Sequence, residues 1–178
     1  NHDHWCDAAY IEQVLSNAGV EVLTNRALPL GELVPAHTGE AWLAGIDSCW
    51  TRRGSTGPGA DPEAAFAEVP SGVDVVVLGH EPHLATMHEH VLHVAGHTHC
   101  GQVRTPIFGD WTARMHMPRF SEPFPCRLYE VPVERESSLP DARRTTRDRR
   151  WVYTTAGVGY STVDFRLFCP PELVVIDC

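Results

Sequence analysis

The apolar residues between positions 7 and 18 recur at the spacing of an amphipathic helix. Asp7 is suited to the N-cap of this helix, because its carboxylate can accept hydrogen bonds from the free backbone N–H groups of the first turn. Gly19 is suited to the helix end, because glycine adopts the left-handed conformation that closes many helices. A second helix is predicted over residues 61–68, where an aspartate is followed at once by a proline. We expect the first helix to pack beside a sheet.

Short apolar runs between and after these helices predict strands. The run over residues 73–78 is almost purely apolar and β-branched, which is typical of a central strand covered on both faces. Another alternating run leads up to His97 and predicts a buried strand that ends there. Further strands are predicted over residues 20–23, 38–45, 150–156 and 173–177, with a turn over residues 25–29. Strands and helices that succeed one another in this order indicate an α/β fold.

Length and composition fit a single domain over residues 1–178. The chain is 43% hydrophobic and 21% charged, as is usual for a globular protein. Its character changes from about residue 103 to 150, where prolines and arginines accumulate and only Cys126 to Val131 alternates weakly as a strand would. We expect a long loop or insertion there, either a lid whose arginines meet anionic groups or a solvated charged segment.

The formal net charge is -9, and all 14 basic residues are arginine. A net acidic chain has no general attraction for nucleic acid, so no nucleic-acid partner is expected. No apolar run approaches the roughly 20 residues that a membrane helix needs. We therefore expect no transmembrane segment in this chain, and a soluble domain that is either cytoplasmic or peripherally associated with a membrane.

The 6 cysteines are spread widely and include no Cys-x-x-Cys pair. This spacing argues against a zinc knuckle or a thioredoxin-type site, and it predicts buried or incidental thiols rather than a disulfide framework. Cys100 differs from the rest, because it directly follows a pair of histidines and could be a neighbour of metal ligands or an oxidation-sensitive thiol.

Side chains that can bind metals stand at three separate places. The chain begins Asn1-His2-Asp3, the run over 73–78 is followed by Gly79-His80, and a third run ends in Gly96-His97-Thr98-His99. Residues two apart in a strand point to the same face, so His97 and His99 could reach adjacent metals. Imidazole nitrogen suits zinc, iron and manganese alike. The alternative for His97-Thr98-His99 is that its two histidines are hydrogen-bonded loop residues without a metal.

Taken together, these segments resemble the later motifs of the calcineurin-like metallophosphoesterases, in particular a bacterial branch of that family. The first is similar to the end of Gly-Asn-His-Asp/Glu, the second to a Gly-His strand end, and the third to Gly-His-Thr-His. Residues 157–161 and 166–173 resemble the ending of the same branch. The resemblance implies an α/β sandwich of two mixed β-sheets flanked by helices, of which this chain would be the C-terminal portion.

The resemblance also implies a phosphoesterase, a hydrolase that cleaves a phosphomonoester or a phosphodiester with a metal-activated water. Its cofactors would be two divalent or trivalent metal ions, namely Mn, Fe or Zn. Asn1, His80 and His97 would bind one metal and His99 the other, while His2 would be the catalytic residue beside the phosphate. The substrate would be a small-molecule or lipid phosphate ester, and the resemblance names no substrate-binding residue.

The chain departs from the family pattern at its start. The family's Asp-x-His and Gly-Asp motifs, which supply the bridging carboxylate, normally precede the asparagine, and neither is found here. We therefore expect an N-terminally incomplete domain that lacks a segment of the same protein. The isolated chain should bind at most one metal, weakly, and have little or no hydrolase activity, whereas the complete protein should be active. A non-catalytic metal-binding or structural domain is the alternative function. A lactamase-like hydrolase is disfavoured, because Cys-Gly-Gln follows His99 where that class has Asp-His.

Four further polar residues have predicted places. Asp47 ends a segment that resembles the family's Leu-x-Gly-x-Asp strand, and it is either a residue behind the metal ligands or an exposed acid closing a strand. His83, His88 and His90 are predicted to lie on the rim of the cleft rather than to bind metal.

Overall fold

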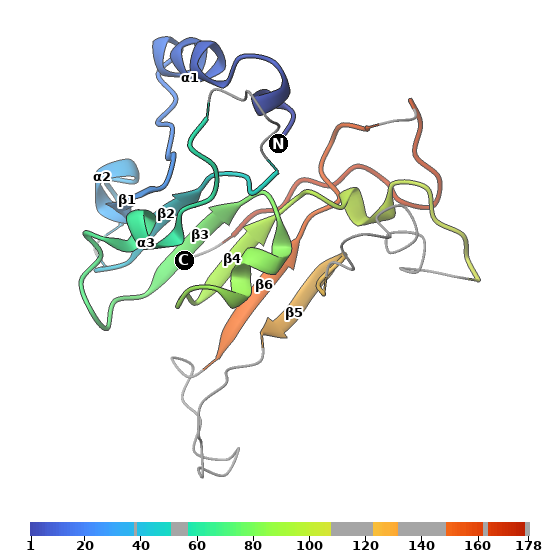
Figure 1. Cartoon of the computed structure of the whole chain (residues 1–178). Coiled ribbons are helices and arrows are strands. Elements are labelled where there is room, and N and C mark those ends of the chain that lie inside the picture. The colour runs from blue at the N-terminus through green and yellow to red at the C-terminus, as the bar shows by residue number, and fades with distance from the viewer. Residues whose placement is uncertain (38, 51–56, 108–122, 132–148, 162–163, 177–178) are drawn as a thin grey trace, which may run out of the picture. The chain divides into compact units, whose positions relative to one another are not determined.

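The computed structural model of this chain describes residues 1–37, 39–50, 57–107, 123–131, 149–161 and 164–176 (Figure 1). The chain divides into two compact units, Asn1–His80 and Glu81–Cys178. Most of the predicted insertion at 103–150 falls outside the described residues. The prediction of a single domain stays a prediction.

The described part of the first unit combines three strands with short helices. In chain order these are η1 (Asp3–Trp5), α1 (Ala8–Asn17), β1 (Arg26–Pro29), α2 (Leu30–Leu33), β2 (Trp42–Ile46), α3 (Pro62–Phe66) and β3 (Val75–Gly79). β1 pairs antiparallel with β2, and β2 pairs in parallel with β3, with Trp42 opposite Val75. Parallel neighbours need a crossover connection, and α3 lies in it and packs against β1 and β2.

Both predicted N-caps are confirmed. The Asp7 carboxylate accepts a hydrogen bond from the backbone N–H of Tyr10 at 3.1 Å, and that of Asp61 accepts one from Ala64 at 2.9 Å. The expected packing of α1 beside the sheet is wrong, since none of its side chains is buried and Tyr10 is 66% exposed. Figure 1 shows α1 lying apart from the strands of its own unit.

The first strand lies later in the chain than predicted. Residues 20–23 are irregular, and the predicted turn over 25–29 instead contains β1. Gly45 explains the difference, because a Cβ at this position would stand 2.1 Å from the carbonyl oxygen of Leu23. Only glycine allows the backbone at Leu23 to come this close to β2. Leu23 therefore lies against β2 without pairing with it, and β1 is the strand that pairs with β2.

β3 is confirmed as a strand, but it is not covered on both faces. Val75 and Val77 are buried, together with Ala44 and Ile46 of β2, whereas Leu78 is 44% exposed. Side chains alternate between the two faces of a strand, so this pattern assigns one face of β3 to the core.

The described part of the second unit contains η2 (Pro82–Thr86), β4 (Leu92–Ala95), η3 (His99–Gly101), β5 (Arg127–Val131) and β6 (Arg150–Thr154). β6 is the middle strand of this unit, parallel to β4 and antiparallel to β5. Val152 of β6 lies opposite His93 on one side and Tyr129 on the other. A core of Ala85, Phe124, Val131 and Val152 forms around it.

A disulfide joins Cys100 to Cys126, which corrects the expectation of unpaired thiols for these two residues. Cys169 remains a free thiol and is buried in a cluster with Cys100, Cys126 and Ala156. The two bonded cysteines are 26 residues apart in the chain, a spacing that carries no recognisable disulfide signature.

The predicted strand over 173–177 is wrong for its described residues, 173–176, which form no strand. Leu173 and Val175 are 83% and 85% exposed. The residue that precedes this segment, Glu172, is anchored to the rest of the unit. Its carboxylate accepts hydrogen bonds from the Tyr153 hydroxyl at 2.7 Å and from the Ala156 backbone N–H at 3.0 Å.

The α/β class is confirmed, since parallel and antiparallel strand pairs occur together with a few short helices. That two sheets face each other in a sandwich stays a prediction. Across the described segments, the helices are too short or too polar to cross a membrane.

Candidate functional site

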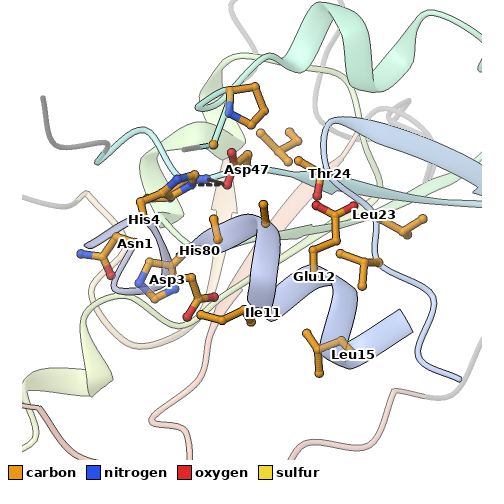
Figure 2. Close-up of a pocket in the computed structure, with 17 residues that line it drawn as sticks. Asn1, Asp3, His4, Ile11, Glu12, Leu15, Leu23, Thr24, Asp47 and His80 are labelled. Carbon is orange, nitrogen blue, oxygen red and sulfur yellow. Dashed lines mark hydrogen bonds and ion pairs between the residues drawn. The ribbon is translucent and has the colours of Figure 1, made fainter. Parts of the chain in front are cut away.

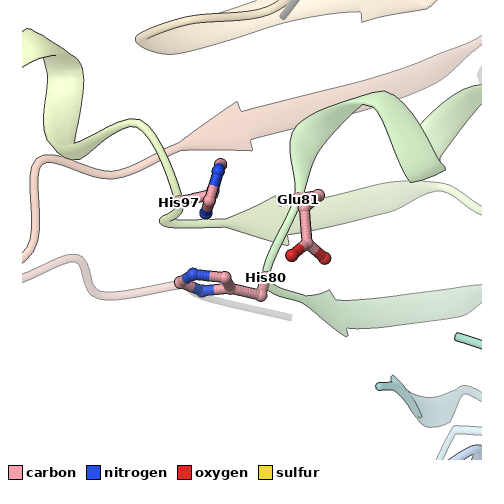
Figure 3. A group of neighbouring side chains, drawn as sticks. All are labelled: His80, Glu81 and His97. Atoms are coloured by element: carbon pink, nitrogen blue, oxygen red, sulfur yellow. The ribbon is translucent and has the colours of Figure 1, made fainter. Parts of the chain in front are cut away.

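Two histidines and a glutamate form a group of potential metal ligands (Figure 3). His80 directly follows β3, Glu81 is the next residue of the chain, and His97 comes two residues after the end of β4. One ligand atom from each of the three lies within 4.8 Å of the others.

The donor set of this group fits a metal ion. Two imidazole nitrogens and one carboxylate oxygen suit zinc, manganese or iron. Glu81 has 0% of its surface exposed and His97 has 8%. A carboxylate buried to this degree is costly unless it is paired or binds a cation. The group therefore has the chemistry of a metal centre, with Glu81 and His97 buried and His80 half-buried.

Local sequence explains why Glu81 is fixed beside His80. β3 ends at Gly79 and η2 begins at Pro82, so only two residues link the strand to the helix. Glu81 is the residue before a proline and is extended, with φ -94° and ψ 127°, as the proline ring requires. Glu81 was not predicted from the sequence, although it stands between a candidate ligand and a proline that begins a helix.

The prediction that His97 and His99 share a strand face is wrong. β4 ends at Ala95, His97 lies in the turn that follows, and His99 begins η3. His99 has a left-handed φ of +50° and is half-buried, with its Nδ1 3.3 Å from Oε1 of Gln102. In the described part of the chain the ligand group includes His97 but not His99.

The turn after His97 is fastened to the segment that precedes β5. The Thr98 hydroxyl donates a hydrogen bond to the carbonyl oxygen of Pro125 at 2.6 Å. The disulfide adds a covalent link from Cys100 to Cys126. These two adjacent connections fix the backbone that carries the histidines.

A cavity of about 320 Å³ lies within the first unit (Figure 2). Its apolar wall comes from α1 and from residues 22–23, and Asn1 and His80 both line it. Two of the predicted metal ligands, one from the start of the chain and one from the end of β3, thus share a cavity. The remaining polar residues that line it are Asp3, His4, Glu12, Thr24, Asp47 and Ser48.

His4 and Asp47 form a buried hydrogen-bonded pair in this cavity. The His4 Nε2 lies 2.7 Å from Oδ1 of Asp47, and Figure 2 shows the two side chains facing each other. The His4 side chain is 4% exposed and that of Asp47 is 15% exposed. Asp47 is therefore not an exposed acid. Its predicted support of the metal ligands would act through His4. His4 was not predicted from the sequence.

His2 points elsewhere. It is exposed and stacks on Trp5, with 4.3 Å between the ring centroids. Its neighbours Asn1, Asp3 and His4 are among the described residues that line the cavity, and His2 is not.

Three further histidines are buried together in the second unit. His88 and His90 are 8% and 6% exposed, so the prediction that they lie on the rim of a cleft is wrong. The His88 Nε2 lies 3.2 Å from Nδ1 of His93, which is fully buried. Burial is the largest cause that lowers the pKa of His88 and His93 to about 3 each and the pKa of His90 to about 4. All three imidazoles are consequently neutral at pH 7.

Two curated proteins are similar to this chain. Phosphodiesterase YaeI of Escherichia coli (strain K12) is 29% identical over 170 residues, which cover 94% of this chain and 50% of that protein. A transmembrane protein with metallophosphoesterase domain of Danio rerio is 28% identical over 185 residues, which cover 99% of this chain and 36% of that protein. No protein-family model and no solved structure matches the chain.

The chain therefore spans half or less of the length of the curated relatives that it matches. Both similarities extend over nearly the whole chain, and the names of the two relatives are those of a phosphodiesterase and of a protein with a metallophosphoesterase domain. They support the metallophosphoesterase family for this chain, at modest identity.

Proposed function

Starting from the metallophosphoesterase family, we propose that this chain is the metal-binding part of a hydrolase that cleaves phosphoric ester bonds. The observation that carries the proposal is the group of His80, Glu81 and His97, whose ligand atoms lie within 4.8 Å of one another. The names of the two relatives, a phosphodiesterase and a protein with a metallophosphoesterase domain, favour this chemistry.

The proposed metal ligands are Asn1, His80, His97 and His99, with Glu81 added on the basis of its burial and position. Metal ions bound in such a site neutralise charge on the phosphoryl oxygens and lower the pKa of a bound water, and we propose two of them, of manganese, iron or zinc. Asn1 contributes a neutral amide oxygen, whereas Glu81 contributes negative charge that offsets the charge of the cation. We propose His2 as the catalytic residue, which protonates the leaving oxygen.

The proposed substrates are phosphomonoesters or phosphodiesters of small molecules or lipids. The net charge of -9 gives the chain no general attraction for nucleic acid. A metal site supplies the local positive potential that an anionic phosphate needs in such a chain.

The proposal is tested with the whole protein, stripped of metal with a chelator and then titrated with Mn²⁺. We expect hydrolysis of a chromogenic phosphodiester or phosphomonoester that depends on added metal. His97→Asn and Glu81→Gln should each weaken Mn²⁺ binding and lower turnover by about 10-fold or more. The matched control is Glu63→Gln, an exposed glutamate in the first turn of α3, which should change neither.

A non-catalytic metal-binding domain is the second candidate, and the orientation of His2 favours it. His2 stacks on Trp5 instead of lining the cavity. His2→Ala separates the two functions, because an enzyme should lose turnover and keep its metal. Mn²⁺ binding without hydrolysis of either ester by the unsubstituted protein would select the non-catalytic function.

A further inference from the structure

We propose that His4 and Asp47 are positioning residues, whose hydrogen bond holds the first turn of the chain so that Asn1 presents its side-chain oxygen to the metal. This inference rests on the proposed function, since it needs Asn1 to be a ligand. It concerns only residues of the first unit. His4 and Asp47 both line the cavity that Asn1 and His80 also line (Figure 2).

His4 is the anchor of the turn. The turn is the 3₁₀ helix η1, closed by a hydrogen bond of 2.9 Å from the Trp5 N–H to the His2 carbonyl and one of 3.0 Å from the Cys6 N–H to the Asp3 carbonyl. Within η1, His4 alone is buried, at 6% exposure. Such a short helix has little stability of its own, so the side chain that reaches the interior sets its position.

Asp47 is a rigid partner. It follows β2, and its backbone N–H donates to Oδ1 of Asn25 at 2.9 Å. Its Oδ1 accepts hydrogen bonds from the Ser48 N–H at 2.8 Å and from His4, and its Oδ2 accepts one from the Gly59 N–H at 3.0 Å. Because both oxygens of the carboxylate accept hydrogen bonds, Asp47 has a fixed position relative to the end of β2. The His4 ring that binds it is fixed there as well.

The surroundings of Nδ1, the other ring nitrogen of His4, support a positioning role for this side chain. Nδ1 is buried and has no hydrogen-bond partner among the described residues. Gly57 lies against it, since a Cβ at Gly57 would stand 1.8 Å from Cε1 and 2.2 Å from Nδ1 of His4. With Nε2 bonded to Asp47 and Nδ1 facing Gly57, neither nitrogen is directed at a substrate. His4 is therefore a positioning residue and not a catalytic one.

The matched variants are His4→Phe and His4→Gln. Phenylalanine keeps the ring and removes the N–H, whereas the glutamine amide nitrogen can reach the place of Nε2 and donate to Asp47. Loss of a group that orients a metal ligand typically weakens metal affinity about 10- to 100-fold. We therefore expect the Mn²⁺ dissociation constant of the whole protein to rise by about this factor in His4→Phe and to stay within about 3-fold in His4→Gln.

Two readouts separate positioning from a general loss of structure. Hydrogen exchange of the Trp5 and Cys6 amides, measured without metal, should be faster in His4→Phe and unchanged in His4→Gln. Turnover of His4→Phe should return to that of the unsubstituted protein at saturating Mn²⁺, because only metal binding is impaired. If His4→Phe does not fold, Asp47→Asn, which keeps the shape of the side chain, should weaken Mn²⁺ binding in the same direction.

Each contrary result has a definite meaning. Unchanged Mn²⁺ affinity in folded His4→Phe, unchanged amide exchange, or a loss of turnover that saturating Mn²⁺ does not restore would overturn the inference and leave the proposed function standing. Failure of the unsubstituted protein to bind Mn²⁺ would overturn the proposed function instead.

Discussion

Acidification from pH 7 to pH 5 should strongly destabilise the second unit, because three buried histidines must be neutral in the folded state. The pKa of each is lowered by burial, to about 3 for His88 and His93 and to about 4 for His90. An unfolded histidine has a pKa of about 6.5, so between this value and the folded pKa the unfolded chain binds more protons. The free energy of unfolding therefore falls as the pH falls below about 6.5.

The magnitude follows from these pKa values. Each pH unit below the unfolded pKa costs about 1.4 kcal/mol for each histidine that stays neutral, so one such residue contributes a loss of about 2 kcal/mol at pH 5. The mutual repulsion of the three rings does not alter this sum, because it acts only when more than one ring carries a proton. Three residues together reach about 6 kcal/mol, a large part of the stability of a typical domain.

The assay is urea denaturation of the metal-free protein at several pH values between 7 and 5, in the presence of a chelator. His93→Phe removes one of the three groups from the middle of β4, and it should reduce the dependence of the unfolding free energy on pH by about 1.4 kcal/mol per unit. Val152→Ala, at the position opposite His93 in β6, is the matched control. It should lower stability by a similar amount at every pH, because it creates a cavity without removing a titrating group.

A constant difference in unfolding free energy between the unsubstituted protein and His93→Phe from pH 7 to pH 5 would refute the reasoning. It would mean that the pKa of His93 is the same in the folded and unfolded states, so that the ring is solvated rather than held neutral by burial.

Three further predictions concern single features of the fold. Gly45→Ala should lower the free energy of unfolding by about 1–3 kcal/mol, because the new Cβ would collide with the Leu23 carbonyl oxygen, and urea denaturation would measure this loss. Reduction of the disulfide between Cys100 and Cys126, which closes a loop of about 26 residues, should lower stability by about 3 kcal/mol, and an unchanged denaturation midpoint with and without reductant would contradict it. Asp7→Ala should lower the free energy of unfolding by about 1 kcal/mol, because α1 loses its N-cap. The helical circular dichroism signal should fall by the part that α1 contributes, and Mn²⁺ binding should not change.

Local signals in the sequence were sufficient for several elements of the fold. Asp7 and Asp61 are caps whose chemistry depends only on the residues next to them, so both helix starts were predictable. The first strand was misplaced because its position depends on a contact between Gly45 and Leu23, which are far apart in the chain. Strand propensity cannot predict this contact, because it depends only on each residue and its neighbours in the sequence.

The residues of the candidate site were likewise predictable only in part. The apolar runs that end in His80 and His97 gave two of the three grouped ligands, because strand ends are visible as breaks in hydrophobicity. Glu81 was missed because its burial, at 0% exposure, is a tertiary property. His4 was missed because its role comes from Asp47, 43 residues away in the chain.

The charges around the buried histidines of the second unit explain why we propose His97, and not His88 or His93, as a metal ligand. His97 stands beside the carboxylate of Glu81, whose negative charge offsets that of a bound cation. His88 and His93 instead face each other, and the Arg150 guanidinium donates a hydrogen bond to the His88 carbonyl at 2.8 Å. The repulsion from Arg150 is among the causes that lower the pKa of His88, and it would oppose a divalent cation there for the same reason. Imidazole alone therefore does not define the proposed metal centre, and the position of the buried carboxylate distinguishes it from the other buried histidines.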